Sequence, residues 1–154
     1  VPPDLPVGQI QMSRGDTRWK GRAYGNHFRT WEKQKLFNGD ALYAGASSRL
    51  VVTLGLVELT MLAQSRLSVE FKDVAEVRLQ YGELEMSLPA GERVRVSEGS
   101  KAFEVSSVNG GRVKISTAGG LHAQNLGGDL VVRTGGKAEI NIPKEEYFRA
   151  GSGL

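Results

Sequence analysis

The chain has 154 residues, no cysteine, 20 glycines and a formal net charge of +3. The absence of cysteine excludes disulfide bonds, thiolate metal sites and cysteine nucleophiles. No apolar run reaches the roughly 20 residues that a transmembrane helix needs. The length predicts one domain that buries a core without cross-links.

The N-terminal part of the chain carries its excess positive charge. Residues 1–35 hold seven Lys or Arg against three Asp or Glu, whereas the other 119 residues hold 13 against 14. Within this part, the proline-rich residues 1–6 predict a stiff linker and lack the features of a signal peptide. We expect a single domain over residues 7–150 and a short tail over residues 151–154.

The segment 14–35 interleaves aromatic and basic side chains more densely than any other stretch. Aromatic rings stack on sugars or bases, and arginines bind phosphate or carboxylate. The segment is therefore a candidate docking surface for a protein, a glycan or a nucleic acid. Alternatively, its two tryptophans seal one end of the core. The candidate contact residues are Trp19, Arg22, Tyr24, His27, Arg29 and Trp31.

The next stretch, "LFNGDALYAGASSRLVVTLG" over residues 36–55, contains two glycine turns and two serines. A nucleophile elbow needs G-x-S-x-G, and Gly45-Ala46-Ser47-Ser48-Arg49 lacks the second glycine. Ser47 and Ser48 are therefore predicted to be turn residues. The alternation that follows predicts a strand that buries Leu50, Val52 and Leu54.

From residue 67 onward, apolar and polar residues alternate in short runs that are separated by glycine turns. Even "VELTMLAQSRL", which also fits a helical spacing, is better interpreted as a strand in this context. Asn38-Gly39 and Asn109-Gly110 are the strongest signals for two-residue hairpins. The fold class predicted is all-β: short antiparallel strands and hairpins with glycine turns, stacked as a sandwich or an irregular β-solenoid.

The sequence contains no convincing catalytic constellation. Glu83 and Glu85 share one face of a predicted strand at a separation near that of glycosidase carboxylates, but an exposed strand face explains the pair equally well. Two histidines without a metal-binding spacing do not build a metal site, and no phosphate-binding glycine motif is present. We therefore expect no catalytic residues, no metal and no cofactor.

The order of these features resembles the FecR-like domain. In that family an opening strand leads to an apolar-x-x-Gly-Asp-x-Leu-x-x-Gly corner, and strands with the pattern V-x-L-x-x-Gly-x-L follow. The resemblance continues through "RVRV", "KAFEV", "GRVKISTAGG" and "NIPKEEYFRAG", and it covers about 140 residues. The residues that match the first part of the pattern are Gly39, Asp40, Leu42, Gly45, Ser48, Leu67, Val77, Leu79, Gly82 and Leu84.

The resemblance implies a non-enzymatic domain that is located outside the cytoplasmic membrane, in the periplasm or cell envelope. Such domains relay signals or are appended to peptidoglycan-binding or surface modules. We therefore expect a protein-interaction or signalling module with a protein partner in the envelope. The alternative is a glycan- or peptidoglycan-binding module that uses the segment between Trp19 and Trp31. We expect no nucleic-acid partner, and we expect exposed strand edges to be able to pair two copies.

Overall fold

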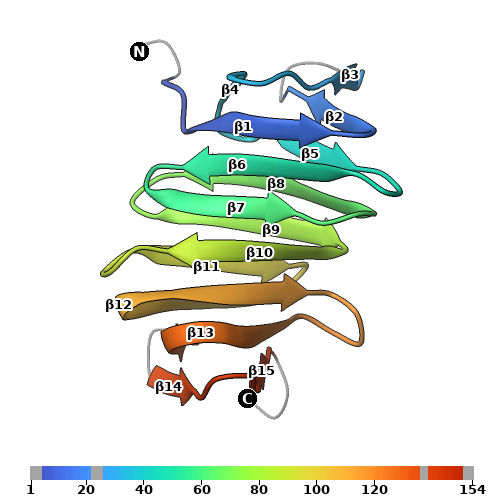
Figure 1. Cartoon of the computed structure of the whole chain (residues 1–154). Helices are drawn as coiled ribbons and strands as arrows, with labels where there is room; N and C mark the ends of the chain where they lie inside the picture. Colours follow the sequence, from blue (N-terminus) through green and yellow to red (C-terminus); the bar gives the residue numbers. More distant parts are fainter. Residues whose placement is uncertain (1–4, 22–25, 136–138, 151–154) are drawn as a thin grey trace.

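The computed structural model describes residues 5–21, 26–135 and 139–150, and it is all-β over these ranges. Fifteen strands form one hydrogen-bonded sheet that curls on itself (Figure 1). The predicted fold class is confirmed, including the strand interpretation of residues 57–67. In the described part of the chain no helix is long and apolar enough to cross a membrane.

The strands vary from two to sixteen residues in length. They are β1 (Gly8–Arg14), β2 (Thr17–Lys20), β3 (Phe28–Arg29), β4 (Lys35–Leu36), β5 (Ala41–Ala44), β6 (Arg49–Leu54), β7 (Val57–Met61), β8 (Ser65–Phe71), β9 (Ala75–Tyr81), β10 (Glu83–Leu88), β11 (Arg93–Glu98), β12 (Lys101–Ser116), β13 (His122–Arg133), β14 (Glu139–Ile142) and β15 (Tyr147–Arg149).

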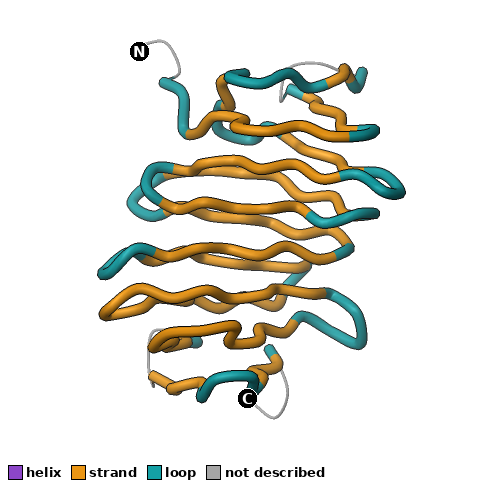
Figure 2. Tube along the Cα trace, in the orientation of Figure 1, coloured by secondary structure: helices purple, strands orange, loops and turns teal. Residues whose placement is uncertain are grey.

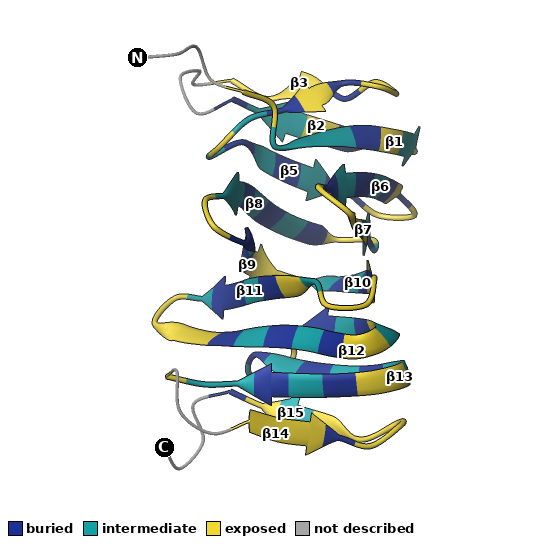
Figure 3. Cartoon of the chain, turned by 90° about the vertical axis from the view of Figure 1, so that its left-hand side faces the viewer, coloured by how far each residue is buried: buried dark blue, intermediate teal, exposed yellow. Residues whose placement is uncertain are grey.

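The curled sheet has two facing layers (Figure 3). We call the layer with β4, β1, β6, β7 and β10 the front layer, and the layer with β3, β2, β5, β8, β9 and β11 the back layer. The long strands β12 and β13 belong to both, because β12 pairs with β11 in its first half and with β10 in its second half. All neighbouring strands are antiparallel except β9 and β11, which are parallel. Loops and turns lie at the ends of the strands (Figure 2).

Tight corners connect the two layers and stack on one another. The amide of Gly45 donates to the carbonyl of Asp16 at 2.9 Å, and the amide of Gln64 donates to the carbonyl of Gly45 at 3.1 Å. Farther along, the amide of Thr117 donates to the carbonyl of Gly82 at 3.1 Å. Gly82 has φ +100°, and a Cβ there would lie 2.5 Å from Cα of Ser65. Only glycine allows this approach together with this backbone conformation.

The two serines of the 36–55 stretch belong to one of these corners. Ser47 adopts the left-handed conformation at φ 54°. The hydroxyl of Ser48 accepts a hydrogen bond from the amide of Asp16 at 2.8 Å and donates one to the carbonyl of Ala46 at 3.0 Å. The hydroxyl therefore satisfies backbone groups where the chain passes from β5 to β6.

The hydrophobic core lies between the layers. Alternation along each strand sends aliphatic side chains inward, and the strand with Leu50, Val52 and Leu54 buries all three completely, as predicted. The largest fully buried side chains are Ile10, Leu36, Leu42, Leu50, Leu54, Leu59, Met61, Leu67, Leu79, Leu84, Met86 and Leu88. Burial of apolar surface on this scale is the main force that holds the layers together.

Both predicted two-residue hairpins are wrong. Asn109-Gly110 lies inside β12, where the strand bends from the back layer to the front layer. Glycines make this bend feasible, because a Cβ on Gly128 of β13 would collide with the carbonyl of Gly110. Asn38-Gly39 connects β4 and β5, which belong to different layers and do not pair with each other.

Candidate functional site

An open pocket lined by aromatic side chains lies at the N-terminal end of the stack. Trp19, Phe28, Arg29 and Trp31 line a hollow of about 540 Å³, which we call the Trp pocket. The ring centroids of Trp19 and Phe28 are 5.9 Å apart, and those of Trp19 and Trp31 are 6.3 Å apart at an interplanar angle of 78°. Such tilted and edge-on contacts are favourable aromatic geometries. Trp31 and Phe28 are 55% and 47% exposed.

The sheet positions two of these side chains directly. Trp19 of β2 lies opposite Phe28 of β3 in the antiparallel register, and β3 forms the edge of the back layer. Trp19 also packs against the hydrophobic core. Cross-strand neighbours stand about 5 Å apart at Cβ, which explains why these rings touch.

A buried hydroxyl cluster fixes the chain between Phe28 and Trp31. The hydroxyls of Thr17 and Thr30 lie 2.5 Å apart, and the amide of Thr30 donates to the carbonyl of Thr17 at 3.1 Å. Next to it, the amide of Gln34 donates to the carbonyl of Trp31 at 3.2 Å, and the amide of Lys33 donates to the carbonyl of Ile10 at 2.7 Å. These bonds hold the turn that presents Trp31 to solvent.

The structure brings together three of the predicted contact residues, Trp19, Arg29 and Trp31. Arg22 and Tyr24 lie outside the described residues. The two tryptophans differ in environment, since Trp19 packs against the core and Trp31 is mostly exposed. Trp19 therefore has the environment that a seal for the core requires, and Trp31 has the exposure that a docking surface requires.

His27 lines a separate hollow of about 270 Å³ on the outer face of the back layer. Although its ring is exposed, partial desolvation lowers the pKa of His27, and the nearby cations Arg66, Lys20 and Arg18 lower the pKa further. The shift follows because each of these effects disfavours the imidazolium form. Three cations, Arg66, Lys20 and Arg18, therefore lie near His27.

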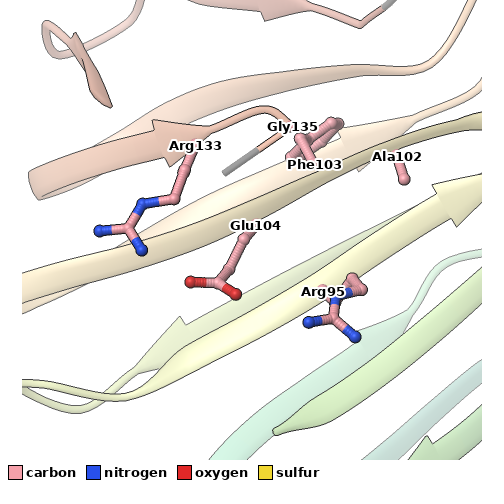
Figure 4. Close-up of a pocket in the computed structure, with 6 residues that line it drawn as sticks. All are labelled: Arg95, Ala102, Phe103, Glu104, Arg133 and Gly135. Carbon is pink, nitrogen blue, oxygen red and sulfur yellow. The ribbon is translucent and has the colours of Figure 1, made fainter. Parts of the chain in front are cut away.

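A third hollow, of about 280 Å³, lies farther along the same layer and includes Arg95, Glu104 and Arg133 (Figure 4). The three charged side chains come from neighbouring strands that pair in register. Each has an ion-pair partner: Arg95 pairs with Glu76 at 3.8 Å, Arg93 pairs with Glu104 at 3.5 Å, and Arg133 pairs with Glu139 at 2.5 Å. The charged side chains of this hollow form a row of ion pairs across neighbouring strands, which we call the charge ladder.

The carboxylate pair considered as a glycosidase site is also engaged in ion pairs. Glu85 lies 2.8 Å from Arg112, and Glu83 lies 3.7 Å from Lys114. Both acids alternate with buried residues of β10, as an exposed strand face predicts. Over the described ranges, no group of three or more His, Asp or Glu lies close enough together to hold a metal ion.

Over the described residues, the fold and these surfaces define an all-β protein with an exposed aromatic pocket at the end of a curled sheet. Comparisons of the chain with models of known families, with characterised proteins and with solved structures found no significant match.

Proposed function

We propose that the chain is a non-enzymatic FecR-like domain of the periplasm or cell envelope, and that it binds a protein partner through the Trp pocket as an interaction or signalling module. The observation that carries this proposal is the exposure of Trp31 and Phe28 around a hollow at the sheet end. The class and the location rest on the resemblance of the sequence to the FecR-like pattern.

The composition of the Trp pocket fits an interaction hot spot. Tryptophan and arginine are the residue types most enriched among the side chains that dominate binding energy in protein interfaces. Exposed apolar side chains that gather in one place mark interaction surfaces more often than single ones do. Trp19 anchors the cluster to the core and leaves Trp31 available for a partner.

Site-specific photo-crosslinking tests this proposal. A photoreactive amino acid is introduced in place of Trp31 or, as a matched control, in place of Leu56. Leu56 is 72% exposed in the turn between β6 and β7. We expect one defined envelope protein to be crosslinked from the Trp31 position and not from the Leu56 position.

Alanine substitutions at the same two positions complete the test by measuring the loss of binding to the partner. Trp31→Ala is expected to weaken capture of the crosslinked partner by about tenfold or more, which is the size of a hot-spot effect. Leu56→Ala is expected to leave capture unchanged. Equal crosslinking from both positions, or unchanged capture by Trp31→Ala, would rule out the Trp pocket as the docking site.

A glycan, including peptidoglycan, is the second candidate ligand. The hollow of about 540 Å³ falls within the range of small-molecule pockets, roughly 300–1,000 Å³. Both tryptophans of the chain line this hollow, so intrinsic tryptophan fluorescence reports on this pocket. Two results would favour the glycan over the protein partner. The first is a saturable fluorescence change with soluble peptidoglycan fragments, and the second is retention on purified sacculi that is abolished by Trp31→Ala.

Pairing of two copies through strand edges stays a prediction. The edges available are the short strands β3 and β4 at one end, and β14 and β15 at the other. Two-residue edges offer few backbone groups for pairing, so we expect association of copies to be weak. Sedimentation velocity over a range of concentrations measures it.

A further inference from the structure

The outer face of the back layer carries a row of arginine and tyrosine side chains. In the strand registers Arg18 lies opposite Tyr43, Tyr43 lies opposite Arg66, and Arg66 lies opposite Tyr81. The row therefore crosses β2, β5, β8 and β9 in alternation. With Asp16 and His27, these side chains line the hollow of about 270 Å³, which we call the Arg66 pocket.

A β-bulge creates the last position of this row. Val77 and Leu79 of β9 point into the core, and strict alternation would send Tyr81 inward as well. The register shifts between Arg66 and Leu67 of β8, so that Leu67 pairs with Leu79 and Arg66 pairs with Tyr81. Tyr81 is consequently 43% exposed and borders Arg66. Bulges redirect single side chains in this way.

Arg66 differs from the arginines of the ladder farther down the same layer. Arg95 and Arg133 each have a carboxylate partner. Within the described ranges Arg66 has no ion pair, and its Nε is buried without a hydrogen-bond partner. A buried Nε–H in this situation lacks an acceptor, which costs free energy unless a ligand supplies one.

The other groups of the pocket do not neutralise Arg66. Asp16 is the one carboxylate among the described lining residues, and Arg18 already holds it at 2.9 Å. Lys20 of β2 and Arg18 add positive potential around His27. The pocket thus combines an unpaired guanidinium, two tyrosine side chains and an imidazole.

We propose that the Arg66 pocket binds an oxyanion, the carboxylate or phosphate group of a larger ligand. The planar guanidinium of Arg66 matches such groups with two parallel N–H donors. The hydroxyls of Tyr43 and Tyr81 supply further donors from either side in the row. The proposal does not depend on what occupies the Trp pocket, because it rests on a different set of side chains.

Titrations with two simple probes test this site. Isotope-labelled protein is titrated with inorganic phosphate and, separately, with acetate, at constant ionic strength, while NMR follows Arg66 Nε–H and the His27 ring. We expect saturable shifts of these signals with at least one probe. Saturation by phosphate alone or by acetate alone supports the site and identifies the group it prefers.

Variants separate specific binding from general charge attraction. Arg66→Gln is expected to raise the dissociation constant of the bound probe by about tenfold or more. Arg66→Lys is expected to raise it by less, because lysine keeps the charge and loses the planar guanidinium. Lys144→Gln removes the same charge near the opposite end of the stack and is expected to have no effect. Tyr81→Ala, at an exposed position, provides a second test if Arg66→Gln unfolds the chain.

Shifts that rise linearly without saturation for both probes would overturn the proposal. It would also be overturned if Lys144→Gln weakened binding as much as Arg66→Gln does, since an adventitious ion only would then account for the shifts.

Discussion

Replacing Gly82 with alanine tests how the layers are joined. The left-handed conformation of this residue, φ +100°, costs an L-amino acid about 1–2 kcal/mol. The new Cβ would also lie 2.5 Å from both Cα and Cβ of Ser65 and 2.6 Å from the carbonyl oxygen of Gln64. Backbone must therefore move, and overpacking of this kind costs roughly 1–3 kcal/mol. We expect the free energy of unfolding to fall by about 2–5 kcal/mol.

Gly91→Ala is the matched control for this change. Gly91 has φ +81°, and a Cβ there meets no atom within 4 Å, so only the conformational cost of about 1–2 kcal/mol applies. Urea denaturation followed by circular dichroism measures both variants. If Gly82→Ala cost no more than Gly91→Ala within about 0.5 kcal/mol, the stacked corners would not hold the two layers as described.

Three further changes have defined outcomes. Asn125→Ala removes a buried side chain that bonds two backbone carbonyls and one backbone amide. It should lower the free energy of unfolding by about 2–4 kcal/mol, and a loss under about 1 kcal/mol would contradict its bridging role. Glu85→Gln breaks the exposed ion pair with Arg112, and denaturation should show a change below about 1 kcal/mol. NMR titration should place the pKa of His27 below its ordinary value, and Arg66→Gln should raise it. The unfolded chain binds the His27 proton more tightly than the folded chain does, so His27 should reduce the free energy of unfolding as the pH falls below about 6.5. An unchanged His27 pKa in Arg66→Gln would contradict the proximity of His27 and Arg66.

The sequence predicted the features that depend on local periodicity. Alternation identified the strands and their inward faces, as at Leu50 and Val52, because one buried face requires a period of two. The absence of a second glycine around Ser47 and Ser48 correctly predicted a corner in place of a nucleophile elbow.

Features that depend on strand register could not be predicted from the sequence. Asn109-Gly110 has the local chemistry of a hairpin turn, but a bend within a strand uses the same conformational freedom of glycine. The bend forms because β12 pairs with β11 in its first half and with β10 in its second half. The bulge that exposes Tyr81 leaves no mark in the alternation of β9. His27 and Trp31 are close in sequence, yet they line different hollows.

The exposed position of Trp31 makes the central proposal directly measurable. The free energy of unfolding and the capture of the crosslinked envelope partner are measured together for Trp31→Ala. We predict that capture weakens by about tenfold or more while the free energy of unfolding falls by no more than about 1.5 kcal/mol, the size of the edge-on contact with Trp19. Unchanged capture accompanied by a loss of more than about 2 kcal/mol would instead make Trp31 a seal for the core and contradict the proposed function.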